Sequence, residues 1–103
     1  MAGSAKAGAR KDYLASLQAW LERHKDYPRR ARVRRDQGTA LLRFVIDRSG
    51  RVLEYRIERS TGHALLDREV EAMIARADPL PPIPGTFGED RLEISVPIAF
   101  VLR

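Results

Sequence analysis

Residues 92–102 read LEISVPIAFVL, and this stretch decides the fold. Apolar side chains recur at every second position, a period that is typical of a β-strand with one buried face. They are Leu92, Ile94, Val96, Ile98, Phe100 and Leu102. Pro97 falls inside the run, and a proline has no N–H group to offer a neighbouring strand. The stretch is therefore predicted to be a strand at the edge of a sheet.

An edge strand leaves one row of backbone N–H and C=O groups without a strand partner. Proteins either protect such an edge or use it to bind an extended peptide as an additional strand. Because the direction of these groups alternates along a strand, every second residue presents them outward. Those residues are Glu93, Ser95, Pro97, Ala99 and Val101. We interpret this edge as one that is used for binding.

Three helices are expected upstream of this strand. Residues 12–24 carry apolar side chains at helical spacing, with Asp12 as the expected N-cap. The stripe comprises Tyr13, Leu14, Leu17, Trp20, Leu21 and His24. Pro28 suits the first position of a short helix that extends to residue 35. Residues 64–77 form the third helix, with Leu66, Val70, Met73, Ile74 and Ala77 on one face.

A β-hairpin is expected between the second and third helices. Residues 40–47 alternate, 47–50 read DRSG as a tight turn, and 51–59 form the second strand. In that strand Leu53, Tyr55 and Ile57 are expected on one face, and Trp20 and Tyr55 are interpreted as core residues. Residues 78–90 contain four of the six prolines and predict an extended connector.

These elements predict one α+β domain in two layers. The hairpin strands are antiparallel, and the third helix and the connector return the chain so that the last strand pairs antiparallel with the first. The expected sheet has three strands in the order 2-1-3, with two main helices packed on one face. Residues 1–11 are expected to be a flexible lead-in, and 12–103 to form the domain. No apolar run approaches the ~18 residues of a membrane span.

The net charge of +5 is concentrated in one stretch. Residues 29–35, RRARVRR, contain no acidic residue and five arginines: Arg29, Arg30, Arg32, Arg34 and Arg35. The other 14 basic residues equal the 14 acidic residues of the chain. The simplest interpretation is a solvent-exposed helix face. The alternative is a contact patch for phosphate, nucleic acid or another anionic surface.

The residue patterns of enzymes and metal sites are absent from this sequence. There is no cysteine, and the two histidines, His24 and His63, lie in unrelated settings without ligand spacing. No nucleophile elbow, phosphate-binding loop or dinucleotide fingerprint occurs. We therefore expect no catalytic residue, no metal and no cofactor. Tyr27 lies outside the helical stripes, and it is expected either to anchor the joint between two helices or to contact a partner.

An ordered set of short motifs resembles one family. It comprises His24-Lys25-Asp26-Tyr27-Pro28, Gly38, Phe44, Ile46-Asp47, Gly50-Arg51-Val52, Ile57, Ser60-Thr61-Gly62, Leu66-Asp67, Ala77-Asp78-Pro79-Leu80-Pro81-Pro82, Val96-Pro97-Ile98 and Phe100. Over residues 13–103 the chain is similar to the C-terminal domain of TonB, an energy-transducing protein of Gram-negative bacteria. No single element is specific, but the ordered set is.

The resemblance implies a periplasmic adaptor without a cofactor. Its partner would be the TonB-box peptide near the N-terminus of an outer-membrane transporter of the siderophore or cobalamin type. That peptide would add to the last strand over Glu93–Val101 and contact His24, Lys25, Asp26, Tyr27 and Pro28. An inner-membrane helix and a proline-rich spacer, both absent from this fragment, would connect the domain to motor proteins driven by the proton gradient.

Other interpretations follow from the same residues. A periplasmic adaptor of the TolA type has a similar strand and helix plan but different partners. A nucleic-acid or anionic-surface module would use the five arginines, but aromatic residues are not interleaved with them, and we expect no nucleic-acid partner. We expect a monomer or a weak homodimer, because Pro97 limits but does not abolish pairing between edges.

Overall fold

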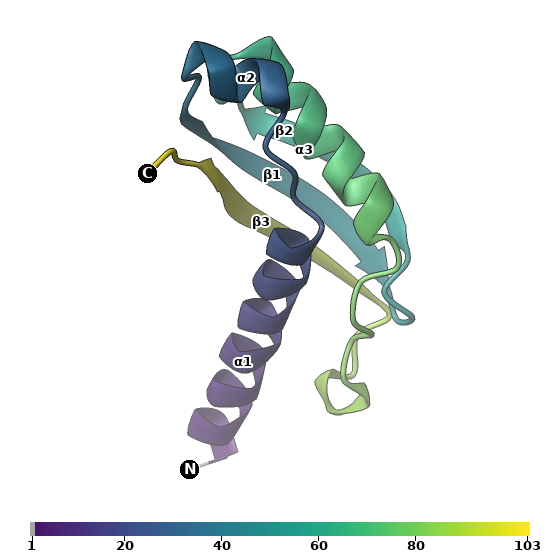
Figure 1. Ribbon diagram of the computed structural model, residues 1–103. Helices are drawn as coiled ribbons and strands as arrows, with labels where there is room; N and C mark the ends of the chain where they lie inside the picture. Colours follow the sequence, from purple (N-terminus) through teal and green to yellow (C-terminus); the bar gives the residue numbers. More distant parts are fainter. Residues whose placement is uncertain (1) are drawn as a thin grey trace.

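The computed structural model describes residues 2–103, with side chains described from residue 8 onward. Its elements are, in chain order, α1 (Ala2–Arg23), α2 (Arg29–Arg34), β1 (Gly38–Asp47), β2 (Val52–Arg59), α3 (Ala64–Ala77), the short 3-10 helix η1 (Gly85–Phe87) and β3 (Arg91–Phe100), as Figure 1 shows. None of the helices in the described part has an apolar stretch suited to crossing a bilayer.

The three strands form one antiparallel sheet in the order β2-β1-β3. β1 is the central strand, and β2 and β3 are the two edges. Gly38 lies opposite Phe100 and Leu41 lies opposite Pro97, so β1 and β3 are paired along their whole length. The predicted fold class is confirmed: a two-layer α+β domain with strand order 2-1-3 and two main helices on one face.

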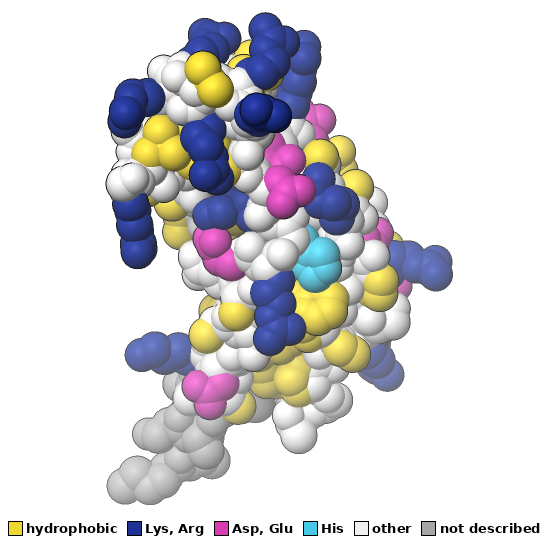
Figure 2. Space-filling model, viewed as in Figure 1, with side chains coloured by type: hydrophobic (Ala, Val, Ile, Leu, Met, Phe, Trp, Pro, Cys, Tyr) yellow, Lys and Arg dark blue, Asp and Glu magenta, His cyan; other side chains and the backbone are white. Residues whose placement is uncertain are grey.

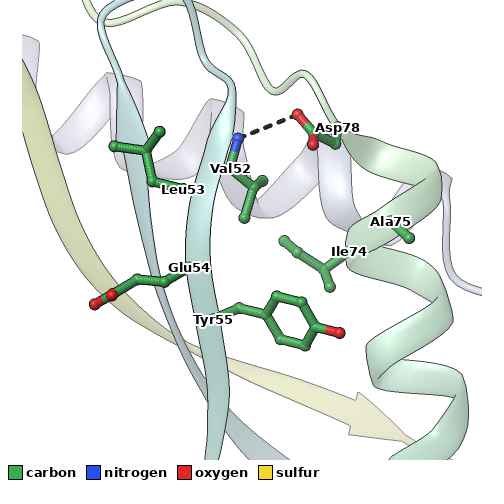
Figure 3. A pocket seen from close by; sticks show the side chains of 7 residues that line it. All are labelled: Val52, Leu53, Glu54, Tyr55, Ile74, Ala75 and Asp78. Atoms are coloured by element: carbon green, nitrogen blue, oxygen red, sulfur yellow. Dashed lines mark hydrogen bonds between the residues drawn. The ribbon is translucent and has the colours of Figure 1, made fainter.

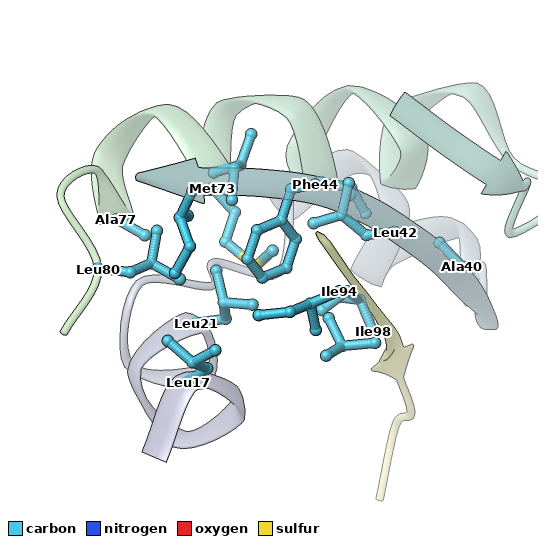
Figure 4. Close-up of a cluster of buried hydrophobic side chains, with 14 of the residues drawn as sticks. Leu17, Leu21, Ala40, Leu42, Phe44, Met73, Ala77, Leu80, Ile94 and Ile98 are labelled. Carbon is cyan, nitrogen blue, oxygen red and sulfur yellow. The ribbon is translucent and has the colours of Figure 1, made fainter. Parts of the chain in front are cut away.

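The core lies between the sheet and the two long helices (Figure 4). The even-numbered residues of β1 and β3 face this layer, as the period of two predicts. The largest fully buried side chains include Leu17 and Leu21 of α1, Phe44 of β1, Met73 of α3 and Phe100 of β3. Burying each such side chain contributes ~1.5–3 kcal/mol. This packing fixes α1 against the sheet next to β3.

The expected start of the first helix is wrong, and the second helix ends one residue earlier than expected. α1 begins at Ala2, and Asp12 lies within it rather than at its N-cap. Residues 2–10 include four alanines, a lysine and an arginine, and these strong helix formers extend the helix upstream. The division of the chain at residue 11 stays a prediction, although α1 crosses it without a break. Pro28 is the N-cap of α2 rather than its first residue, and Arg35 ends α2 in the left-handed conformation.

The predicted faces of β2 are only partly correct. Register shifts relative to β1 occur at both ends of β2, and Val52, not Leu53, lies opposite Ile46. The extra residue of a β-bulge turns the following side chains to the opposite face. Figure 3 shows Leu53 pointing away from α3, while Tyr55 points toward it. Tyr55 is nevertheless 43% exposed, so its interpretation as a core residue is wrong.

The connector between α3 and β3 is attached to the β1–β2 turn. The N–H of Leu80 donates to the carbonyl oxygen of Gly50 at 2.8 Å, and that of Ile83 to Arg48 at 3.0 Å. Both side chains are buried, so the connector packs against the domain. The connector is not extended throughout, because η1 interrupts it.

Candidate peptide-binding edge

The outer side of β3 has no strand partner among residues 2–103. Pro97 identifies which residues face outward, because its carbonyl oxygen is contacted from outside the sheet by the side chain of Gln18. Alternation then directs the backbone groups of Glu93, Ser95 and Ala99 outward as well. Val101 lies just past the end of β3 and is exposed.

Two side chains of the N-terminal segment cover part of this row. Gln18 Nε2 donates to the carbonyl oxygen of Pro97 at 3.3 Å, and Lys25 Nζ donates to that of Ala99 at 2.5 Å. Within residues 8–103, no side chain is hydrogen-bonded to the outward backbone groups of Glu93 or Ser95. The edge therefore has an open N-terminal half and a C-terminal half occupied by side-chain donors.

A groove runs between α1 and the open half of the edge. Its volume is about 350 Å³, and it is lined by Arg10, Leu14 and Gln18 from α1 and by residues 92–97 from β3. Leu14 was placed in the apolar stripe of the helix, but it is 37% exposed and forms the groove wall instead. Leu14 and Gln18 were not among the residues predicted for the site. The groove places the exposed Leu14 side chain, together with the polar side chains of Arg10 and Gln18, beside a row of backbone groups.

The predicted His24–Pro28 segment lies at the other end of the same edge. Lys25 contacts Ala99, and its ammonium lies 5.3 Å from the centre of the Phe100 ring. The ring of Tyr27 packs edge-on against Phe100, with 5.5 Å between the ring centres. Of the predicted residues in this segment, Lys25 is thus the one that contacts a predicted residue of the strand, Ala99.

α3 already holds several backbone groups of that segment. The buried carboxylate of Glu69 accepts the N–H of Asp26 at 2.7 Å and also pairs with Arg76. Arg76 donates to the carbonyl oxygen of His24 at 2.7 Å, and the His24 ring is hydrogen-bonded to the carbonyl oxygen of Trp20. These contacts fix the segment's path. They leave fewer backbone groups for a partner, and no sequence motif marked Glu69 or Arg76.

Tyr27 and Pro28 form the joint between α1 and α2. The Tyr27 hydroxyl donates to the carbonyl oxygen of Asp36, and its ring is half-buried against the core. Pro28 supplies the carbonyl that accepts the N–H of Arg32 at 2.9 Å. Of the two roles expected for Tyr27, the structure shows the anchoring one. Contact with a partner stays a prediction for both residues.

The side chains beside the free edge form a polar network on the face of the sheet that points away from the helices. Arg43 of β1 donates to Glu93 at 2.6 Å and to Glu54 at 3.4 Å, and Ser95 donates to Glu58 at 2.8 Å. The hydrogen bond from Arg43 lowers the pKa of Glu93. Glu93 is thus kept ionised, and this face of β3 is polar.

The opposite edge of the sheet, β2, is protected at its ends. The N–H of Val52 donates to the Asp78 carboxylate at 3.1 Å, shown by the dashed line in Figure 3. The register shifts at both ends of β2 disturb its regular pairing pattern. Bulges and side-chain caps of this kind are devices that discourage pairing with another strand. β3 is therefore the better candidate edge.

The five arginines are all exposed, and they lie apart from the open half of β3. Four residues of α2, namely Arg29, Arg30, Val33 and Arg34, surround a shallow hollow of about 260 Å³. Arg32 lies over the Tyr27 ring at 5.4 Å. In the part of the chain that the structure describes, no group of His, Cys, Asp or Glu side chains is arranged to hold a metal ion.

Comparison with known proteins identifies the family. Residues 23–102 match the family model described as the C-terminal part of the Gram-negative bacterial TonB protein. The chain is 39% identical over 83 residues to Protein TonB of Pseudomonas putida, covering 80% of this chain and 34% of the relative. It is 34% identical over 88 residues to Protein TonB of Pasteurella multocida, covering 85% and 33%. The chain thus spans about a third of the length of these relatives.

Solved structures agree with the sequence comparisons. The Helicobacter pylori TonB-CTD, residues 179–285, superposes with a TM-score of 0.76 at 26% identity, covering 89% of this chain and 82% of that one. The HasB CTD superposes with a TM-score of 0.57 at 37% identity, covering 88% and 70%. Sequence motifs, strand order and fold therefore lead to one conclusion: the chain belongs to the family of Gram-negative bacterial TonB C-terminal domains.

Proposed function

We propose that this domain is a periplasmic adaptor that binds the N-terminal TonB-box peptide of an outer-membrane transporter. The peptide adds as a fourth strand along the outer side of β3. The proposal depends on one observation: the outward backbone N–H and C=O groups of β3 have no strand partner and lie beside a groove of about 350 Å³. Family membership supports the partner class, because TonB proteins are energy transducers for transport.

The energetics require side-chain contacts in addition to backbone pairing. A ladder of about five backbone hydrogen bonds contributes about 5 kcal/mol at ~1 kcal/mol each. Micromolar affinity corresponds to about 8 kcal/mol. An aliphatic side chain buried in the groove adds ~1.5–3 kcal/mol. The guest peptide therefore needs at least one apolar residue against Leu14, while its backbone bonds tolerate varied sequences.

The whole protein's role follows as part of the same proposal. A segment outside this chain would anchor it in the inner membrane and couple it to motor proteins that use the proton gradient. Tension carried along α1 would reach the core through the buried side chains of Leu17 and Leu21. From the core it would pass through β3 to the bound peptide. The transported nutrient, of siderophore or cobalamin type, is defined by the transporter and not by this domain. The domain itself is proposed to have no enzymatic role.

A titration of the isotope-labelled chain with a synthetic TonB-box peptide tests the proposal. We expect micromolar binding, with amide shifts centred on residues 93–101 and 24–28. A scrambled peptide of the same composition is the control. A peptide from a Tol-system partner separates this adaptor from a TolA-like one. If saturating TonB-box peptide leaves the β3 signals in place, binding by strand addition is refuted.

A further inference from the structure

α2 carries a compact surface that the proposed peptide site does not use. Arg29, Arg30, Val33 and Arg34 are spaced so that they share one face of the helix, and we call this face the α2 ridge. On the opposite side Ala31 is fully buried against the domain. α2 is therefore fixed by its inner side and presents the ridge outward.

An aliphatic side chain stands at the centre of the ridge. Val33 is 76% exposed, the most exposed of the large apolar side chains in the described part of the chain. The hollow around it is about 260 Å³ and has an almost entirely apolar lining, formed with the stems of the neighbouring arginines. Figure 2 shows basic side chains gathered around apolar surface at this end of the molecule. The ridge thus combines an apolar centre with a cationic rim.

The charge of the ridge is poorly compensated. Among the described residues, no acidic group lies within ion-pair distance of Arg29 or Arg30, and Arg34 reaches Asp36 only at 3.7 Å. Asp36 itself is buried and also lies 3.5 Å from His63. Because the charges of the rest of the chain balance, the stretch containing the ridge accounts for the net charge of +5.

We propose that the α2 ridge is a docking surface for a phospholipid bilayer with anionic headgroups. The arginine guanidinium groups would contact headgroup phosphates, while Val33 and the arginine stems enter the boundary with the acyl chains. A basic face with an aliphatic centre is typical of interfacial helices. Surfaces that bind single-stranded nucleic acids instead combine arginines with aromatic side chains for base stacking, and the ridge has no aromatic residue.

The bilayer surface and the peptide site do not compete for the same residues. The ridge precedes Gly38, whose partner is Phe100, so it lies at the end of the sheet where β3 terminates. The groove and the open half of the edge, around Glu93 and Ser95, lie toward the other end of β3. A domain docked by α2 would keep that half available. The inference therefore goes beyond the proposed function and does not depend on it.

Co-sedimentation of the whole chain with lipid vesicles tests the proposal. Vesicles of phosphatidylcholine are compared with vesicles of equal parts phosphatidylcholine and phosphatidylglycerol. We expect weak binding to the anionic vesicles only, reduced at high salt because the charges are exposed. Each arginine contributes about five-fold to the partition coefficient, so Arg29→Gln/Arg30→Gln should lower it by about 25-fold. Val33→Ser should lower it by about three-fold to ten-fold with no change in charge.

A matched variant controls for net charge. Arg51→Gln/Arg91→Gln removes the same number of charges at the opposite end of the sheet, where Arg91 lies opposite Asp47 in the strand register, and should change the binding little. Equal losses for the two double variants would overturn the proposal, as would absence of binding. Competition by an oligonucleotide or polyglutamate, with no effect of Val33→Ser, would replace it with a general polyanion contact.

Discussion

The side chain of Gln18 in α1 donates a hydrogen bond of 3.3 Å to the carbonyl oxygen of Pro97, at the middle of the free edge of β3. Seven residues further on, just past the end of α1, Lys25 donates to the carbonyl oxygen of Ala99 in the same way. These two donors stand where the N–H groups of an added strand would be. In the absence of a guest, the N-terminal segment satisfies the carbonyls that a guest would otherwise use.

Replacing Gln18 tests this relationship. A guest strand must break the bond to Pro97 before it can pair there, and an exposed hydrogen bond contributes ~0.5–1.5 kcal/mol. Gln18→Ala should therefore tighten peptide binding by about two-fold to ten-fold, measured by calorimetry, and lower the unfolding free energy of the peptide-free domain by a similar ~0.5–1.5 kcal/mol. Ser16→Ala, on the exposed side of the same helix, is the control. Weaker binding of Gln18→Ala would mean that Gln18 contacts the peptide instead.

Removing one outward N–H group tests strand addition directly. Ser95→Pro deletes one of the two outward N–H donors, those of Glu93 and Ser95, in the open half of the edge, and Pro97 shows that the strand accepts proline at an outward position. Peptide affinity should fall by about five-fold to thirty-fold, since a lost donor also leaves a guest carbonyl without a partner. Ser95→Ala removes only the contact to Glu58 and should bind normally. Equal affinities for the two variants contradict pairing at this position.

The sheet could be predicted from local patterns because Pro97 and the period of two constrain it independently. A strand with an internal proline must lie at an edge, and the antiparallel return of the chain leaves one order that satisfies this. The buried stripe of α3 could be predicted for the same reason. In each case one residue pattern corresponds to one geometry.

The details of the site depend on packing that no short motif encodes. Leu53 changes face because a bulge inserts one residue, and nothing in RVLEY distinguishes that register from a regular one. The reach of Gln18 and Lys25 to β3 depends on how α1 packs against the sheet. Glu69 is a carboxylate inside an otherwise apolar helix face, and that irregularity is the one available signal for its contact with Asp26.

Gly50 should be among the least replaceable residues. It has a φ of +91°, and a Cβ there would lie 1.9 Å from the carbonyl oxygen of Leu80. Gly50→Ala therefore forces the connector away from the turn and should cost more than ~3 kcal/mol of unfolding free energy in urea titrations. Gly62 has a similar φ of +89° but open space around it. Gly62→Ala should cost only ~1–2 kcal/mol, and equal costs would exclude the steric explanation.

Asp67 should make the domain sensitive to acid. Burial acts to raise its pKa, but hydrogen bonds from Ser60 and Thr61 outweigh burial and lower it. The folded state therefore favours the carboxylate, and the resulting stability is present above the unfolded-state pKa of ~3.9 and lost as the pH falls through the folded-state value. Asp67→Asn should cost about 1–2 kcal/mol at pH 7.

The pH dependence separates this effect from a general loss of packing. The stability difference between the parent chain and Asp67→Asn should stay constant from pH 7 to about pH 5 and shrink below about pH 4. Asp90→Asn, in an exposed pair with Arg48, should change stability by less than ~0.5 kcal/mol. A difference that persists unchanged into acid would show that the Asp67 carboxylate does not stabilise the fold through its charge.

Glu69 connects the stability of the domain to the shape of its proposed partner site. Its carboxylate is 9% exposed, pairs with Arg76 and accepts the N–H of Asp26. Glu69→Gln keeps the shape but weakens charge-assisted bonds, and should cost ~1–3 kcal/mol in unfolding experiments. Because the same bonds fix residues 24–26, the amide signals of that segment should broaden and peptide affinity should fall. Glu71→Gln, on the exposed side of α3, should do neither. Lower stability with unchanged signals at 24–26 would show that Arg76 alone positions the segment.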